Sequence, residues 1–304
     1  MHQSFSVALA LSFAALALAS GGANDWSYSG RDGPQRWGLK PEYSACDKGK
    51  AQSPVNLLSS RVKKEGFPEL VMPSLKKANV STSKHTIQWT PADGAEGGND
   101  RFMVVGGAKY SLAQFHIHTP SEHHVDDKYY DSELHFVHKT ADGKLAVLGV
   151  FLEESVAENP LWSAALSKVP DVGKSTVLDT LLDTSEIKAA VGNGYYNYQG
   201  SLTTPPCSEG VQWFVASTPI RMSLAQIKSV AKIIGFSARP VQYNEALAAQ
   251  SDDGHSGHDG HGAQDDKGKE SAASSQDKHS GAATGIATSV ASFAGLAALL
   301  ALMF

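Results

Sequence analysis

Four of the chain's twelve histidines lie between Gln114 and His124, in the segment QFHIHTPSEHH. His116 and His118 are separated by a single apolar residue. In a β-strand, residues two apart point to the same face, with their Cα atoms about 7 Å apart. Two imidazoles at that separation can converge on one metal ion, because neutral imidazole nitrogen is a common ligand of transition metals. The segment therefore predicts a metal site on a strand.

A third histidine comes from the next predicted strand, SELHFVHKT. Alternation places Glu133 and His135 on one face and His138 on the other, so periodicity alone leaves both histidines open as the ligand. Glu133 favours His135, because a carboxylate on the same face can accept the outer N–H of a ligating ring. Gln114 can do the same beside His116.

Three neutral imidazoles without a fourth protein ligand are typical of a catalytic zinc site, whose open position holds water. The alternative is that these histidines lie in the sheet or the core and bind no metal. The pattern His-x-His leaves this alternative open by itself. The added residues His135, Glu133 and Gln114 in suitable register favour the zinc site.

Two neighbouring strands must position the cluster. The segment RFMVVGGAKYSLAQFHIHT predicts two strands joined at Gly106-Gly107. Alternation predicts Tyr110 and Leu112 on the same face as the first two histidines. A loop over 119–131 would let the strand that carries the third histidine return antiparallel beside them.

The composition is that of an ordinary globular protein with one large domain. The chain has 304 residues, 41% hydrophobic and 19% charged, and a formal net charge of −5 at pH 7. This mildly acidic balance, with no basic run, argues against nucleic acid or an anionic membrane surface as a partner.

The first nineteen residues differ from this domain. Residues 1–19 form an apolar run that ends in Ala17-Leu18-Ala19, a small-x-small cleavage pattern. The run predicts a secretory signal peptide, although no Lys or Arg precedes it.

The C-terminal residues predict a stalk and an anchor. Residues 251–283 contain no large apolar side chain and predict a flexible stalk, although His255, His258 and His261 recur every third residue and could hold a metal weakly. Residues 285–304 carry no charge and have the length of a bilayer span. A small-residue cluster, a polar spacer and an apolar tail predict a GPI-anchor signal at the cell surface, with a single membrane helix as the alternative. Candidate attachment sites are Ala273-Ser274-Ser275 and Ser280-Gly281-Ala282.

Two further features fit a secreted chain. Cys46 and Cys207 are the only cysteines, and an even pair in that compartment predicts one disulfide. On the chain-entropy model, closing this long loop stabilises the fold by about 4–5 kcal/mol at most. The triplet Asn79-Val80-Ser81 predicts N-glycosylation at Asn79.

Several segments together resemble the α-class carbonic anhydrases, in the order and approximate spacing of that family. They are WSYSG, QSPVNL, QFHIHTPSEH, ELHFVH, LAVLGVFL, GSLTTPPCSEGVQW and RPVQ. The resemblance implies one catalytic domain over residues 25–250. Its expected fold is mainly β, a large, twisted, mostly antiparallel sheet of about ten strands with short peripheral helices, a class that the many short apolar runs with Gly and Pro punctuation also suit.

By position, the resemblance makes His116, His118 and His135 the ligands of one zinc ion, with Gln114 and Glu133 holding their rings. In that family a zinc-bound hydroxide attacks CO2 and yields bicarbonate. Thr203 is implied as the residue that accepts a hydrogen bond from this hydroxide. Glu122 would accept a hydrogen bond from the Thr203 hydroxyl, since an ionised carboxylate cannot donate.

The resemblance assigns three more groups of residues. His85 corresponds to the proton shuttle, although Ser83 and Lys84 replace the more usual neighbours, and the lysine would depress its pKa or change its ring orientation. Tyr28 and Gln88 correspond to polar residues of the water-filled cavity. The residues implied in binding substrate are Val137, Val147, Leu202, Thr203, Thr204, Val211 and Trp213.

The sequence thus predicts a zinc-dependent carbonic anhydrase with CO2 and bicarbonate as its substrates. The alternative is a non-catalytic binding protein on the same fold, and a third interpretation is a surface protein that scavenges metal through its stalk. Family members without activity typically lack a zinc ligand, and all three are present here. His123 and His138 are predicted to be structural, and His124 a solvated loop residue.

Overall fold

The computed structural model of the chain describes residues 26–94 and 100–252, with side chains as far as 249. The predicted signal peptide, the anchor and the stalk beyond Asp252 lie outside these residues and stay predictions. Within the described ranges, no helix is both long enough and apolar enough to cross a membrane.

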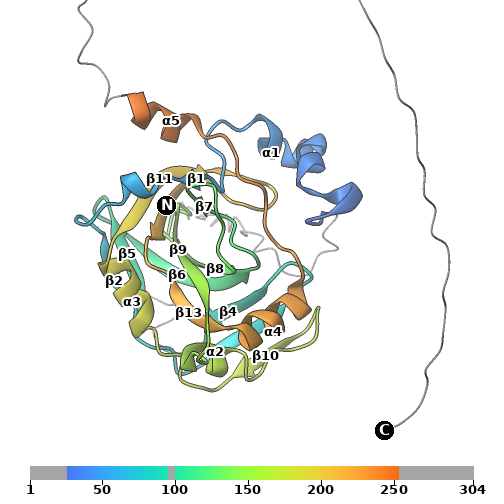
Figure 1. The fold of residues 1–304 in the computed structure, drawn as a ribbon, viewed down its shortest axis with the longest axis vertical. Helices are drawn as coiled ribbons and strands as arrows, with labels where there is room; N and C mark the ends of the chain where they lie inside the picture. Colours follow the sequence, from blue (N-terminus) through green and yellow to red (C-terminus); the bar gives the residue numbers. More distant parts are fainter. Residues whose placement is uncertain (1–25, 95–99, 253–304) are drawn as a thin grey trace, which may run out of the picture. The chain divides into compact units, whose positions relative to one another are not determined.

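Eleven strands of the described chain form one curved sheet, and the predicted mainly β fold is confirmed (Figure 1). Its main path runs β10-β3-β4-β6-β8-β9-β12-β11, with β13 also beside β9, β5 beside β6 and β2 beside β5. All pairs are antiparallel except β9 with β12 and β9 with β13. The strands are β2 (Glu69–Val71), β3 (Ala78–Thr82), β4 (Ile87–Pro91), β5 (Phe102–Val105), β6 (Ala108–His118), β8 (Ser132–Lys139), β9 (Leu145–Ser155), β10 (Ser175–Leu178), β11 (Tyr195–Ser201), β12 (Glu209–Ala216) and β13 (Ile220–Ser223).

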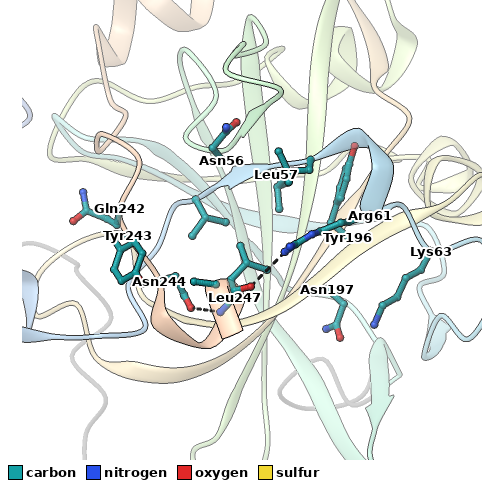
Figure 2. Close-up of a pocket in the computed structure, with 13 residues that line it drawn as sticks. Asn56, Leu57, Arg61, Lys63, Tyr196, Asn197, Gln242, Tyr243, Asn244 and Leu247 are labelled. Atoms are coloured by element: carbon teal, nitrogen blue, oxygen red, sulfur yellow. Dashed lines mark hydrogen bonds between the residues drawn. The ribbon is translucent and has the colours of Figure 1, made fainter. Parts of the chain in front are cut away.

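Short elements surround this sheet, as expected (Figure 1). A small parallel pair joins β1 (Asn56–Leu57) to β7 (His124–Val125). The α-helices are α1 (Ala45–Lys48), α2 (Pro160–Ala165), α3 (Ser185–Gly192), α4 (Leu224–Ile234) and α5 (Glu245–Asp252), and the 3-10 helices are η1 (Gly30–Asp32), η2 (Pro34–Leu39), η3 (Pro41–Tyr43) and η4 (Ser59–Arg61). The last helix, α5, lies against β11 and is tied to η4, because Arg61 Nη1 donates to Leu247 O at 3.3 Å (Figure 2).

Strand β8 lies in the middle of the sheet and is buried on both faces. Leu134 and Phe136 belong to the larger apolar core, whereas Val137 belongs to a second apolar cluster. A strand covered on both faces needs apolar or fully hydrogen-bonded side chains throughout. Both histidines of β8 are buried, His135 at 1% and His138 at 0% exposure, and each has one ring nitrogen in a hydrogen bond, to Glu133 Oε1 and to Phe136 O.

The faces predicted for β6 are correct at its C-terminal end and wrong at its start. Leu112 packs in the larger core together with Phe115 and Ile117. The pairing with β8 shifts between Leu112 and Gln114, where β6 contains one extra residue. A bulge of this kind reverses the alternation, so Leu112 and the preceding Tyr110 lie opposite to the face that carries the histidines.

The turn that follows α4 brings backbone groups to the histidines. This helix starts with a capping box in which Ser223 and Gln226 satisfy each other's backbone N–H groups. It ends before Gly235, whose φ of 63° and ψ of −151° suit only glycine. The chain then turns back, so that Ser237 and Arg239 lie beside the loop that follows β6.

The predicted disulfide between Cys46 and Cys207 is present. It joins α1 to the turn before β12, across a sequence separation of 161 residues. Both cysteines pack in a cluster with Trp26, Tyr28 and Trp37. The bond therefore attaches the N-terminal segment to the main sheet.

His138 predicts a loss of stability in acid. Burial lowers the pKa of its ring to about 4, whereas an unfolded histidine titrates near 6.5. The unfolded chain therefore binds more protons between these values, and stability falls as the pH falls from about 6.5 to 4. The full effect is about 3 kcal/mol.

Urea denaturation at pH 7 and at pH 4.5, at fixed zinc concentration, measures this effect in the native protein and in His138→Gln. The variant should lose less stability than the native protein between the two values of pH. Equal losses would contradict the role of His138.

Candidate metal centre

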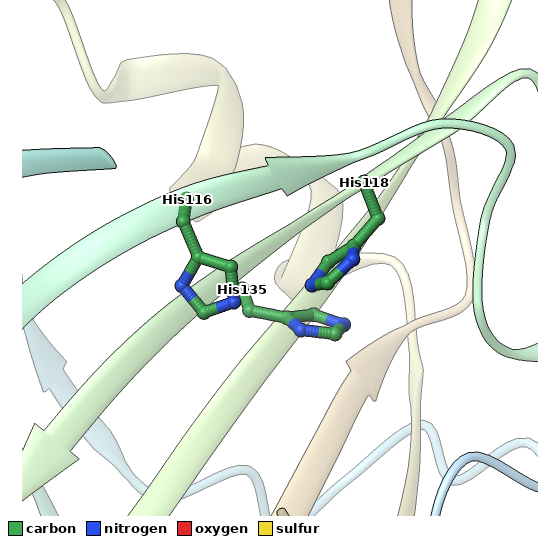
Figure 3. Close-up of side chains that lie close together, drawn as sticks. All are labelled: His116, His118 and His135. Atoms are coloured by element: carbon green, nitrogen blue, oxygen red, sulfur yellow. The ribbon is translucent and has the colours of Figure 1, made fainter. Parts of the chain in front are cut away.

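Three histidines from β6 and β8 converge on one point (Figure 3). His116 lies directly opposite His135 in the antiparallel pairing of the two strands, and His118 follows two residues later on the same face. The ring centroids are 4.7–5.3 Å apart. One nitrogen of each ring lies within 4.8 Å of the others, a spacing that one ion can bridge.

The other nitrogen of each ring has a hydrogen-bond partner. Gln114 Oε1 lies 2.9 Å from His116 Nδ1, and Glu133 Oε1 lies 3.0 Å from His135 Nε2, as the strand faces predicted. The third partner is the backbone oxygen of Ser237, 2.6 Å from Nδ1 of His118. Sequence reasoning missed this contact, because any residue type provides a carbonyl. These bonds orient the rings. They leave Nε2 of His116, Nε2 of His118 and Nδ1 of His135 facing one another.

The chemistry of this cluster fits a divalent metal. His118 Nε2 and Glu122 Oε2 are buried without a hydrogen-bond partner, which costs free energy unless another group binds there. Burial lowers the pKa of His116 and of His118, so both rings are held in the neutral form that binds metal. Three imidazoles, with no further nitrogen or sulfur ligand among the described residues, are the donor set of a catalytic zinc site.

His123 lies beside this cluster but is held by hydrogen bonds on both nitrogens. Its Nδ1 is 2.7 Å from Glu133 Oε1, and its Nε2 is 2.6 Å from the Tyr198 hydroxyl. Burial alone would raise the pKa of Glu133, but the nearby His123 and His135 outweigh it, and the pKa lies well below its usual value. Glu133 is therefore an ionised acceptor that positions both rings.

His124 is not the solvated loop residue that was predicted. It pairs with Asn56 in the short sheet of β1 and β7 and is partly buried. Burial lowers the pKa of its ring. The neighbouring aspartates suggested a solvent-exposed loop, but the contact with β1 is made by a segment that is distant in the sequence.

Glu122 is fully buried, and its carboxylate faces the histidines. Oε1 accepts a hydrogen bond from Arg239 N at 3.0 Å. Oε2 lies 3.5 Å from His118 Nε2 and 3.9 Å from His135 Nδ1. The hydrogen bond expected from Thr203 is not formed, because the free oxygen is turned towards the imidazole nitrogens. Thr203 itself is buried in the turn before the disulfide.

Five of the seven implied substrate residues form one apolar wall. Val137, Val147, Val211 and Trp213 belong to a single buried cluster, and the partly buried Leu202 packs against it. The centroid of the Trp213 ring lies 4.8 Å from that of His135, so this wall adjoins the histidines. Thr204 is partly buried in the turn beside it.

His85 lies half-buried at the edge of the site, stacked on Trp26 with ring centroids 3.9 Å apart. Burial lowers the pKa of its ring, and the positive charge of Lys84 lowers it further, in the predicted direction. Trp26 was missed, because the WSYSG motif does not show what its tryptophan contacts.

The two predicted cavity residues lie beside the metal cluster. The Tyr28 ring centroid is 5.8 Å from that of His85 and 6.5 Å from that of His118. Gln88 lies opposite His116 in the pairing of β4 with β6. The hydroxyl of Tyr28 is buried without a partner, which leaves it available to a water molecule.

Relatives of this chain are known. Residues 32–246 match the sequence model of the eukaryotic-type carbonic anhydrases. The chain is 35% identical to "Carbonic anhydrase" of Pectobacterium atrosepticum, over 80% of this chain and 96% of the relative. It is also 35% identical to "Carbonic anhydrase" of Nostoc sp., over 75% of this chain and 86% of that relative.

A solved structure has the same fold. The α-carbonic anhydrase of Thermovibrio ammonificans, in complex with the inhibitor sulfanilamide, is 40% identical, with a TM-score of 0.65 over 73% of this chain and 96% of that one. With the matching fold, the sequence match and the histidine geometry in agreement, the chain belongs to the eukaryotic-type, or α-class, carbonic anhydrase family.

Proposed function

We propose that this carbonic anhydrase hydrates CO2 reversibly to bicarbonate and a proton at a zinc ion held by His116, His118 and His135. The convergence of three rings, each held from outside by a hydrogen bond, carries this proposal. When bound, zinc acidifies a coordinated water so that hydroxide is available near neutral pH. Gln114, Glu133 and Ser237 keep the three rings in ligating orientation.

The apolar wall provides a place for CO2 beside the metal centre. CO2 is small and carries no net charge, so it gains little from polar groups and is bound where water is poorly held. Val137, Val147 and Val211 are each less than 10% exposed and adjoin Trp213 next to His135. Bicarbonate is charged and polar, so the same wall favours its release.

Glu122 and Thr203 are assigned to orienting the attacking oxygen. A hydroxyl that must accept a hydrogen bond reliably needs its own proton engaged elsewhere, and a carboxylate can only accept. The backbone N–H of Arg239 holds one Glu122 oxygen, and the other has no hydrogen-bond partner, so it would be available to the Thr203 hydroxyl.

Thr203→Ala should lower kcat/KM for CO2 hydration by about a hundredfold, because one positioned hydrogen bond at the reacting atom is lost. Thr203→Ser keeps the hydroxyl and should stay within a few-fold of the native enzyme. Stopped-flow hydration assays with zinc content measured on each sample test this pair. Equal activity of the alanine and serine variants would remove Thr203 from the mechanism.

His85 is assigned to carrying the proton from the centre to solvent. Its ring is neutral at pH 7, because burial and Lys84 lower its pKa, so it can accept a proton. His85→Ala should lower kcat several-fold in weak buffer and leave kcat/KM unchanged, and added imidazole should restore kcat. Lys84→Gln should shift the pH profile of kcat to higher pH, because the positive charge that lowers the pKa of His85 is removed. An unchanged kcat for His85→Ala in weak buffer would exclude this role.

One sample can test the proposed function against its rivals. The purified protein should bind one zinc per chain, hydrate CO2 and lose that activity when an aromatic sulfonamide is added. Stoichiometric zinc without hydration would instead indicate a non-catalytic binding protein. Metal retained only when residues 251–283 are present would indicate scavenging by the stalk.

The location of the enzyme is a separate proposal, that it is held outside the cell by a GPI anchor. The predicted signal peptide and C-terminal tail support it, as do the disulfide and the exposed side chain of Asn79 on β3. A phosphatidylinositol-specific phospholipase should release hydration activity from intact cells. Activity that stays with the membrane would favour the single membrane helix.

A further inference from the structure

A second cavity lies away from the metal centre, between β1, β11 and α5. Its volume is about 500 Å³, within the usual range for small-molecule sites. None of its lining residues is a predicted catalytic, metal-binding or substrate residue. We propose that this cavity binds a small organic anion, with an apolar body and a carboxylate head.

The floor of the cavity is apolar and well anchored. It is lined by Val55, Leu57 and Tyr196, each of which is less than 5% exposed. They belong to the same apolar cluster as Trp213, so the cavity backs onto the wall of the metal centre. Leu247 of α5 also lines the cavity and packs against this cluster. Such a surface favours a hydrocarbon body of limited size.

One end of the cavity carries two cationic side chains. Arg61 and Lys63 line it, and no Asp or Glu is among the lining residues. In Figure 2 their side chains lie on the same side as Asn197, whereas Gln242 and Tyr243 lie on the opposite side, with Leu57 and Leu247 between. The charged end and the apolar middle match a molecule with one anionic head.

Neither cation is neutralised by a carboxylate in the part of the chain that the structure describes. The guanidinium of Arg61 donates to the backbone oxygen of Leu247 at 3.3 Å, a contact that uses one of its five N–H groups. It is half-buried, so a charged partner there is less screened than at an open surface. Arginine also presents a planar fork that suits a carboxylate.

Two nearby carboxylates are already engaged. Asp127 accepts from Asn56 Nδ2 at 2.7 Å, and Asp126 accepts from the backbone of Ser59 at 3.0 Å. Both bonds brace β1 and η4 at the edge of the cavity. Both carboxylates keep their negative charge, but neither forms an ion pair with Arg61 or Lys63 in the described chain, so the two cations remain available to an anionic ligand.

Octanoate is the probe for this site, with octan-1-ol as its uncharged counterpart. Calorimetry is done on the zinc-loaded protein in excess sulfanilamide, which occupies the metal centre. Saturable octanoate binding is expected, with a Kd of about 1 mM or tighter for its ten heavy atoms. Octan-1-ol should bind at least tenfold more weakly, and added salt should weaken octanoate binding.

Charge variants locate the binding. Arg61→Gln and Lys63→Glu should each weaken octanoate binding by about tenfold or more. The matched control is Lys64→Glu, because Lys64 donates to the backbone of Asn193 and does not line the cavity. Lys63 is exposed, so Lys63→Glu should fold even if Arg61→Gln does not. CO2 hydration should stay unchanged in both.

Several results would overturn the proposal. They are the absence of saturable octanoate binding, equal affinity for octanoate and octan-1-ol, and equal weakening by Lys63→Glu and Lys64→Glu. Displacement of sulfanilamide by octanoate would place the anion at the metal centre instead, and would equally refute a separate site.

Discussion

Replacing His116 by alanine will abolish CO2 hydration, with a fall in kcat/KM of at least about a thousandfold. The reason is that His116 is one of three rings, and the two that remain give an ion a donor set that is too small for tight binding. Loss of the metal removes the source of hydroxide at neutral pH, and a thousandfold loss corresponds to about 4 kcal/mol of transition-state stabilisation. Zinc content and stopped-flow hydration are measured on one sample.

The matched control is His124→Ala. This histidine belongs to the same sequence cluster, but it lies on β7 and its ring is 5.7 Å from Tyr129, apart from the three converging rings. The control should keep zinc and activity. A His116→Ala protein that retains full hydration activity, or a His124→Ala protein that loses zinc, would contradict the assignment.

The double variant Cys46→Ser, Cys207→Ser should lower the free energy of unfolding by about 2–5 kcal/mol. The bond closes a loop with a sequence separation of 161 residues, so its loss restores much freedom to the unfolded chain. In the folded state, Cys207 N also donates to Thr204 O, and Arg239 donates to Cys46 O. The bond thus fastens the N-terminal segment to the turn that carries Thr203.

Urea denaturation of the native and double-variant proteins measures the effect, and the slope with denaturant shows whether the unfolded state has expanded. Zinc binding at low temperature should survive, because the ligands lie on β6 and β8 rather than at the bond. A stability equal to that of the native protein would show that the remaining contacts of α1 hold the segment without the disulfide.

Strand alternation predicted much of the centre. The period of two put His116 and His118 on one face, and Glu133 with His135 on another, and the structure brings these faces together. Periodicity left His135 and His138 as alternatives. The pairing register decided between them, since β8 presents His138 to the larger core, where its Nδ1 bonds to Phe136 O.

Other features were hidden because they depend on contacts between distant segments. The bulge in β6 puts Leu112 and Tyr110 on the face opposite to the predicted one. A prediction that assumes uninterrupted alternation along the strand cannot detect such a bulge. The carbonyl of Ser237 holds His118 only because α4 ends at Gly235 and the chain turns back. Trp26 meets His85 from more than fifty residues away in the sequence.

The amino-acid sequence by itself determined which side chains are available to bind a metal, which strands carry them, and which cysteines can pair. Local rules suffice for these, because alternation and turn chemistry act over a few residues. Only the tertiary structure decided which ring nitrogens face inward, which carbonyl holds His118, and that a second, cationic cavity lies behind the apolar wall. These features depend on how segments far apart in the chain pack together, and a local sequence pattern cannot predict that packing.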